Sequence, residues 1–160
     1  MDRLILTLAT LAFCGGGYLL MARGWRSRLR RQAGIAVPPV SDGTARVLVD
    51  WAPGLYVGTT AAGDWLDRIA VHQLSDRSTG ELCVAEDGVH VLRDGLPEVF
   101  VPREDLRAVS VEQSLAGKIV STGMLVLTWQ LGDRELATAF RADDPTAHER
   151  FRTALREVAA

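Results

Sequence analysis

The chain contains residue types that carry out chemistry, but none of them completes a catalytic motif. His148-Glu149 begins the zinc-protease pattern H-E-x-x-H, yet arginine occupies position 152. Gly117-Lys118 resembles part of a phosphate-binding loop, but Ile119 stands where that loop needs serine or threonine. No serine lies in a G-x-S-x-G elbow, and no C-x-x-C pair is present. We therefore expect no catalytic residue, no bound cofactor and no enzymatic activity.

The histidines are the remaining candidates for a metal site. His72, His90 and His148 fall in different predicted elements. His72 and His90 would form a metal site only if they met Asp64 or Asp67 across a sheet. Histidines on strand surfaces account for the same residues without a ligand set, so we expect no metal.

The densest polar cluster consists of Asp64, Trp65, Asp67 and Arg68. Tryptophan and arginine are common anchors of protein interfaces, so these residues predict a protein-interaction surface on a loop. A structural role also accounts for them, because polar loop residues more often satisfy backbone groups than bind partners: Asp64 caps a turn, Trp65 fills the mouth of a barrel, and Asp67 pairs with Arg68 or a neighbour. The sequence leaves both interpretations open.

An N-terminal apolar run predicts one transmembrane helix. Residues 4–22 carry no charge, and a helix of 19 residues rising about 1.5 Å per residue spans a hydrocarbon core of about 30 Å. Tyr18 and Trp25 lie near one end, where amphipathic rings favour the headgroup level. We expect a single-pass protein of the cell (inner) membrane that contacts the bilayer through this helix.

Arginines after the apolar run set the predicted orientation. Arg3 and the terminal amine, offset by Asp2, precede the run, whereas five arginines follow it: Arg23, Arg26, Arg28, Arg30 and Arg31. The positive-inside rule places the N-terminus outside and the C-terminal domain in the cytoplasm. These arginines either bind anionic headgroups or act only as the topology signal.

Two signal sequences are rival interpretations of the same segment. A cleaved signal peptide has its basic residues before the apolar run, whereas here they follow it. Leu11-Ala12-Phe13-Cys14 resembles a lipobox, but Phe13 replaces the small residue of that motif and the run continues to Ala22. The sequence favours an uncleaved helix.

Small residues within the helix predict a contact between helices. Gly15, Gly16 and Gly17 allow close approach, and Ala12 with Gly16 forms a small-xxx-small pair. These small residues could form the contact of a homodimer or of a membrane partner. A tolerated glycine cluster in a plain anchor explains them equally well.

The charge is divided unevenly along the chain. A basic juxtamembrane segment and a linker with Pro38-Pro39, residues 23–44, lead to a body at residues 45–160. We expect the linker to be an extended spacer that holds the body away from the bilayer. The 119 residues after Ser41 hold 12 basic and 19 acidic residues, a net charge of −7. Such a body is unsuited to binding nucleic acid.

The body has the pattern of a small β-domain. Asp87-Gly88 and Asp94-Gly95 each separate two apolar runs and predict consecutive hairpins of type I′, with positive φ at both turn residues. Strand candidates lie at residues 47–51, 55–60, 69–74, 81–86, 89–93, 98–102, 106–112, 124–131 and 134–140, and we expect about seven or eight antiparallel strands. The alternation of Leu125, Leu127, Trp129 and Leu131 predicts one buried face.

The end of the chain changes to helical spacing. Asp144 can cap a helix with Pro145 at its first position, and the apolar residues that follow, Ala147, Phe151, Leu155 and Val158, share one face. We expect a mainly β fold, a bent sheet or split barrel of about seven strands, closed by a helix at about 145–159.

Several segments carry a resemblance to a known family. Gly54–Thr60, Ala62–Arg68, Ala116–Lys118 and Thr128–Asp133 resemble bacterial single-pass membrane proteins with a cytoplasmic pleckstrin-homology-like (PH-like) domain, some of them labelled transporter or export protein. The resemblance implies a fold and a topology but no reaction. Phosphoinositide-binding PH domains use a basic loop between their first two strands, and residues 52–61 contain no lysine or arginine.

These observations together predict a non-enzymatic binding or scaffold module. It would be anchored in the membrane and present a protein-interaction surface at the cytoplasmic face. The alternative is an accessory subunit of a membrane transport or export complex that uses the glycine-rich helix as its contact.

Overall fold

The structure, a computed structural model, describes residues 2–115 and 118–159. Within this range, residue 2 and segments 113–115, 118–122 and 156–159 are described by their backbone only. The chain divides into two compact units, one ending at Gly34 and the other beginning at Ile35. Residues 116–117 of the predicted Ala116–Lys118 turn lie outside the described residues.

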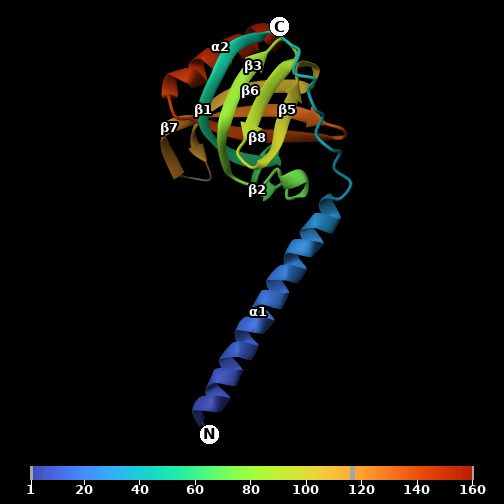
Figure 1. Cartoon of the computed structure of the whole chain (residues 1–160), viewed down its shortest axis with the longest axis vertical. Coiled ribbons are helices and arrows are strands. Elements are labelled where there is room, and N and C mark those ends of the chain that lie inside the picture. Colours follow the sequence, from blue (N-terminus) through green and yellow to red (C-terminus); the bar gives the residue numbers. More distant parts are fainter. Residues whose placement is uncertain (1, 116–117, 160) are drawn as a thin grey trace. The chain divides into compact units, whose positions relative to one another are not determined.

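The first unit is a single helix, α1 (Asp2–Gln32), drawn in blue in Figure 1. It continues through the arginines that follow the apolar run, because arginine, leucine and glutamine are good helix formers. By length and composition the helix can cross a membrane, which is compatible with a membrane anchor or a signal sequence.

The linker is not the free spacer that we expected. Ile35 is buried in the core of the second unit, and its carbonyl oxygen lies 3.0 Å from Nε2 of His72. Further along, the Ser41 hydroxyl donates to the Asp87 carboxylate at 2.9 Å. Burial of the Ile35 side chain in this core is favourable, whereas exposure in a spacer would leave it in water. The domain therefore begins before the predicted residue 45.

The second unit is an antiparallel sheet that curls around one core. The eight strands of the described residues lie in the order β5-β4-β3-β1-β8-β7-β6, with β2 paired to β1. Their bounds are β1 Val47–Ala61, β2 Asp64–Arg68, β3 Ser78–Ala85, β4 Gly88–Arg93, β5 Leu96–Pro102, β6 Leu106–Leu115, β7 Lys118–Leu131 and β8 Arg134–Ala142. In Figure 1, β7 and β8 run behind and across β3 and β5.

Strand β1 is continuous, so the expected break at Pro53-Gly54 is wrong. The strand pairs with β3 over its first part and with β8 over its second. A Cβ atom on Gly54 would lie 2.4 Å from the carbonyl oxygen of Arg141. Glycine is therefore needed here for the close approach of β8 and not for a turn.

The segment after β1 also differs from expectation. Asp64–Arg68 was expected in a loop but forms the short strand β2, whereas the predicted strand at 69–74 is a bend around the 3-10 turn η1 (Val71–Gln73). Ile69 and Leu74 at its two ends are fully buried. The apolar run therefore marks two core contacts and not a strand.

The two predicted hairpins are present as β3-β4-β5. In each turn only the glycine takes a positive φ, 152° at Gly88 and 71° at Gly95, so the expected type I′ geometry is wrong. The expected buried face of β7 is confirmed by Leu125, Leu127 and Trp129.

Helix α2 (Pro145–Ala159) covers one end of the curled sheet. Asp144 caps it as predicted, with its Oδ1 accepting the backbone N–H of Thr146 at 2.9 Å. Ala147, Phe151 and Leu155 are fully buried, and the side chain of Val158 lies outside the described residues. The result is an open antiparallel sheet closed by a C-terminal helix.

Candidate interaction surface

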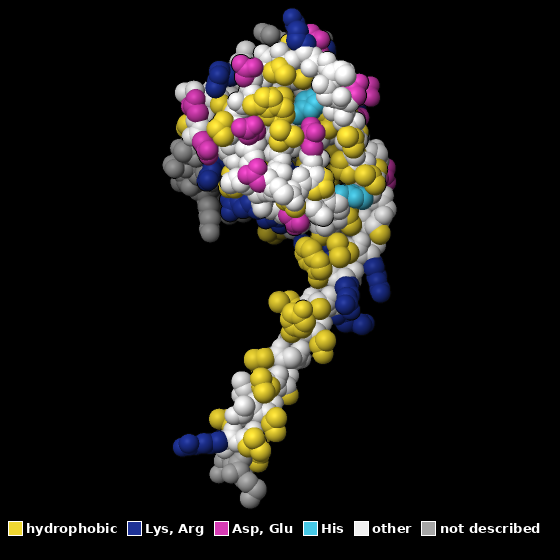
Figure 2. Space-filling view, in the orientation of Figure 1, with side chains coloured by type: hydrophobic (Ala, Val, Ile, Leu, Met, Phe, Trp, Pro, Cys, Tyr) yellow, Lys and Arg dark blue, Asp and Glu magenta, His cyan; other side chains and the backbone are white. Residues whose placement is uncertain are grey.

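The outer face of β1, β3, β4 and β5 carries a mixed apolar and acidic surface. Strand register places Cys83 of β3 opposite His90 of β4, and His90 opposite Phe100 of β5. We call the residues gathered here the outer-face patch: Trp51, Cys83, His90, Leu92 and Phe100, with the carboxylates of Asp50, Glu81, Asp87 and Glu98. Figure 2 shows hydrophobic and acidic side chains together with a histidine over these strands.

His90 is the centre of the patch. Its Nε2 lies 3.0 Å from Oδ1 of Asp87, and its Nδ1 lies 2.8 Å from Oε1 of Glu98. The imidazole stacks against the ring of Phe100 with 4.7 Å between centroids, and the Trp51 ring meets it edge-on at 6.4 Å. Only a protonated imidazole donates to both carboxylates at once.

The two carboxylates govern the charge of this histidine. Burial disfavours the imidazolium, but the hydrogen bonds to Asp87 and Glu98 outweigh it and raise the pKa of His90 above its usual value. Burial likewise opposes ionisation of Asp87, yet the bonds from His90 and Ser41 lower the pKa of its carboxyl. A protonated His90 and an ionised Asp87 therefore stabilise each other.

Cys83 lies beneath the same charges and is not a reactive thiol. Burial, with smaller effects of Glu98, Asp87 and Asp50, raises its pKa to about 12. A thiol held protonated at neutral pH is a poor nucleophile. Cys83 therefore acts as a small apolar residue.

Two apolar side chains of the patch remain open to solvent. Trp51 is 39% exposed and Leu92 is 41% exposed, whereas His90, on the same strand as Leu92, is buried. Asp50 and Glu81 are exposed next to them. A tryptophan and a leucine beside carboxylates form the kind of surface that anchors a partner.

The predicted cluster of Asp64, Trp65, Asp67 and Arg68 lies on β2, and we call it the β2 cluster. Asp64 caps a turn, as the structural interpretation holds, because its Oδ1 accepts the N–H of Leu66 at 2.9 Å. Trp65 packs against a small core cluster of Val126, Ala137 and Ala139. Asp67 also has an interaction partner.

Arg68 is engaged by the backbone of its own domain. Its Nη2 donates to the carbonyl oxygens of Val57 at 2.7 Å and Ser75 at 2.9 Å. Gly58 takes a φ of 136°, and a Cβ atom there would lie 2.4 Å from the same Nη2. The cluster thus joins β2, β1 and the loop after η1, and its role as an interaction surface stays a prediction.

The histidines do not share a site. His90 bonds to the carboxylates of Asp87 and Glu98, whereas Nε2 of His72 lies against the carbonyl oxygen of Ile35. The expectation of strand-surface histidines is wrong for His90, which is 7% exposed. No metal-binding group of three or more His, Cys, Asp or Glu side chains occurs in the described part of the chain.

His148 has the opposite electrostatic setting from His90. It is 2% exposed, and its Nε2 accepts the backbone N–H of Ala142 at 3.0 Å. Burial lowers the pKa of His148, and the neutral ring fastens α2 to the end of β8. Nothing in the local sequence distinguished the two histidines.

The core also contains an arginine that sequence patterns did not single out. Arg93 is 6% exposed, donates to the carbonyl oxygens of Pro97 and Gln73 at 2.7 Å each, and lies over the Tyr56 ring. Burial raises the pKa of Tyr56 to about 12. His72 and Gln73 both take positive φ, and the bond from Arg93 holds this strained turn.

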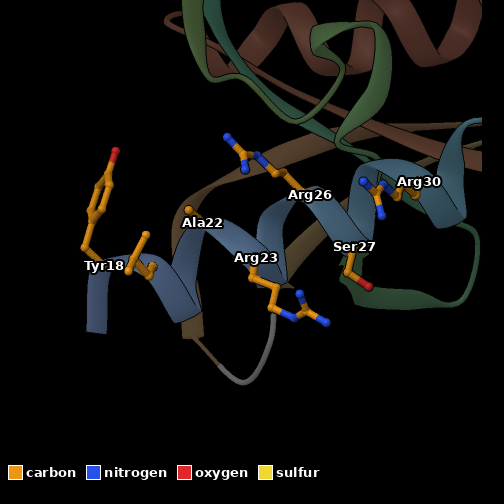
Figure 3. A pocket seen from close by; sticks show the side chains of 7 residues that line it. Tyr18, Ala22, Arg23, Arg26, Ser27 and Arg30 are labelled. Carbon is orange, nitrogen blue, oxygen red and sulfur yellow. The ribbon is translucent and has the colours of Figure 1, made fainter. Parts of the chain in front are cut away.

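Helix α1 carries the other predicted residues. Ala12, Gly15, Gly16 and Gly17 lie on exposed helix, and among the described residues no atom outside the neighbouring helix turn lies within 4 Å of a Cβ placed on any of these three glycines. Arg23, Arg26 and Arg30 follow at spacings of three and four residues, which brings them to one side of the helix (Figure 3). Arg28 and Arg31 belong to the same segment.

An antiparallel sheet that curls around a single core and is closed by a C-terminal helix defines a PH-like domain. Residues 35–156 match the family described as bacterial PH domain-like, and the chain belongs to that family. The match begins at Ile35, the residue at which the second unit begins.

Comparison with other proteins adds the following. No curated protein matches the chain. A chain in the solved structure titled "The 8S snRNP Assembly Intermediate" is 8% identical, with a TM-score of 0.43 over 78% of this chain and 88% of that one. At this identity and TM-score the similarity carries no conclusion about function.

Proposed function

We propose that this protein is a membrane-anchored, non-enzymatic binding module whose PH-like domain presents the outer-face patch to a protein partner at the cytoplasmic face. The observation that carries the proposal is the solvent exposure of two large apolar side chains of the patch, Trp51 and Leu92. The family agrees with it, because the PH-like fold is that of a binding or scaffold module in general. We assign the interaction to the outer-face patch and not to the β2 cluster, because Arg68 of that cluster already donates to two backbone carbonyl oxygens.

The anchor and its direction support the cytoplasmic part of the proposal. α1 has the length and composition of a membrane span, and five arginines follow its apolar part. Under the positive-inside rule these arginines hold the PH-like domain on the cytoplasmic side. Anchoring keeps the domain at the surface and raises its local concentration near membrane partners.

Proximity labelling in intact cells tests this proposal. The labelling enzyme is fused to the C-terminus of the full chain, and we expect a reproducible set of cytoplasmic and inner-membrane proteins. Labelled proteins from the outer side of the membrane would contradict the orientation. The absence of any reproducible neighbour would contradict the binding module.

A matched variant of the anchor distinguishes contacts made by the PH-like domain from contacts made by the helix. Replacing Gly15, Gly16 and Gly17 with leucine keeps an apolar helix but removes the close approach of another helix. We expect the labelled neighbours to persist. Their complete loss would move the interaction from the PH-like domain to the helix.

A further inference from the structure

A shallow hollow continues the outer-face patch toward β1 and β8. Its volume is about 420 Å³, and it shares Glu81 and Leu92 with the patch. Asp94 and Asp143 also line it, and Arg141 on β8 is its only lysine or arginine among the described residues. The exposed apolar side chains therefore adjoin a depression with three carboxylates and one arginine.

Carboxylates outnumber basic side chains in the patch and in the lining of its hollow: Asp50, Glu81, Asp87, Glu98, Asp94 and Asp143 against His90 and Arg141. Asp50 and Glu81 are exposed, and neither appears in the ion pairs found among the described residues. Glu86, by contrast, is neutralised by Arg46 at 3.0 Å and does not contribute. An acidic rim around a tryptophan and a leucine attracts cations and repels anionic groups.

We infer that the outer-face patch and its hollow bind a protein segment that combines arginine or lysine with apolar side chains. This inference rests on the proposed function and names the chemistry of the partner. The apolar side chains of the segment cover Trp51 and Leu92, while its cationic groups lie against Glu81, Asp50 and the carboxylates of the hollow. Anionic lipid is excluded as the occupant, because headgroup phosphates would meet this acidic rim.

The test uses the full chain in nanodiscs of phosphatidylcholine and a fluorescent synthetic peptide of alternating arginine and leucine. Two matched peptides replace arginine with glutamate or leucine with serine. We expect the arginine–leucine peptide to bind, the glutamate peptide not to bind, and the serine peptide to bind at least about tenfold more weakly. Equal binding of the leucine and serine peptides would overturn the inference, because charge alone would then suffice.

Matched variants locate the binding. Trp51→Ala, Leu92→Ala and Glu81→Gln remove patch side chains, and we expect each to weaken peptide binding about tenfold or more. Leu66→Ala and Glu135→Gln remove an exposed leucine and an exposed glutamate elsewhere in the domain and should leave binding within about twofold. An equal loss in both sets would show general attraction to the acidic domain and would overturn the inference.

The result is independent of the labelling experiment. If cells yield labelled protein neighbours but the peptide does not bind at the patch, the inferred chemistry of the partner is wrong and the proposed binding module is still supported. If the peptide binds at the patch but cells yield no neighbour, the proposed function fails instead. An unchanged thermal unfolding midpoint of Leu92→Ala shows that a loss of binding is not a loss of fold.

Discussion

The outer-face patch and the β2 cluster both place tryptophan beside carboxylates, but their side chains have different partners. In the β2 cluster, Arg68 donates to two carbonyl oxygens and Trp65 packs on a small core cluster. In the outer-face patch, the buried His90 bonds to side-chain carboxylates, and Trp51 and Leu92 stay open to solvent. The first region holds the chain in place, and the second remains available to a partner.

The largest expected effect is on the stability that Arg68 provides. Arg68→Ala removes hydrogen bonds to the carbonyl oxygens of Val57 and Ser75 and leaves both without that donor. We expect a loss of about 3 kcal/mol in the free energy of unfolding, measured by urea titration of the full chain in micelles. Arg77→Ala, at an exposed arginine of the neighbouring loop, is the control and should change it by about 0.5 kcal/mol or less. An equally small effect of Arg68→Ala would contradict the structural role that we assign to the β2 cluster.

The two tryptophans should differ in the same measurement. Trp65 packs against Val126, Ala137 and Ala139, so Trp65→Ala should lower the free energy of unfolding by about 2 kcal/mol. Trp51 is more exposed, and Trp51→Ala should cost about 1 kcal/mol or less. If Trp51 proved the more costly of the two, its ring would be part of the core and not of a free surface.

His90 gives the patch a pH dependence of known sign. Its pKa is raised in the folded chain, so its stabilisation is complete below the unfolded value of about 6.5 and is lost as pH rises through the folded pKa. At pH 6, His90→Leu should lower the free energy of unfolding by about 1–2 kcal/mol, since both carboxylates lose a charged donor. The difference between variant and wild type should shrink at higher pH. A difference that grew with pH would mean that the imidazole is neutral in the patch.

His148 should show the opposite dependence, and its effect is the smallest near neutral pH. Its pKa is lowered in the folded chain, so its stabilisation is complete above pH about 6.5 and is lost as pH falls through the folded pKa. His148→Gln keeps an acceptor for the N–H of Ala142 but cannot titrate. Urea titrations from about pH 7 to about pH 5 span the usual histidine pKa of about 6.5. Over this range the free energy of unfolding should fall more steeply for wild type than for the variant. Parallel curves would contradict the buried neutral ring.

Much of the fold follows from local sequence patterns. Asp-Gly pairs predicted the β3-β4-β5 hairpins, alternation predicted the buried face of β7, and Asp144-Pro145 predicted the start of α2. These features depend on residues close together in the chain. The failures at Pro53-Gly54 and at residues 69–74 depend on what packs against the segment, such as the approach of β8 to Gly54.

The candidate site was harder to predict for the same reason. The β2 cluster is dense in the sequence, whereas the outer-face patch joins residues from β1, β3, β4 and β5 that only strand register brings together. The burial of His90 depends on Glu98 and Phe100 of the neighbouring strand as well as on Asp87 three residues earlier, so the local sequence did not predict it. Pattern alone could not tell a side chain that bonds to the backbone from one that is presented to a partner.

Site-specific photo-crosslinking in intact cells tests the difference between the two regions most directly. A photoreactive amino acid replaces Leu92 of the patch or Leu66 of β2, which are 41% and 79% exposed. We expect a reproducible protein adduct from position 92 and none from position 66, although position 66 is the more exposed. An adduct from position 66 alone would contradict the account, because the β2 cluster would then be the surface that binds the partner.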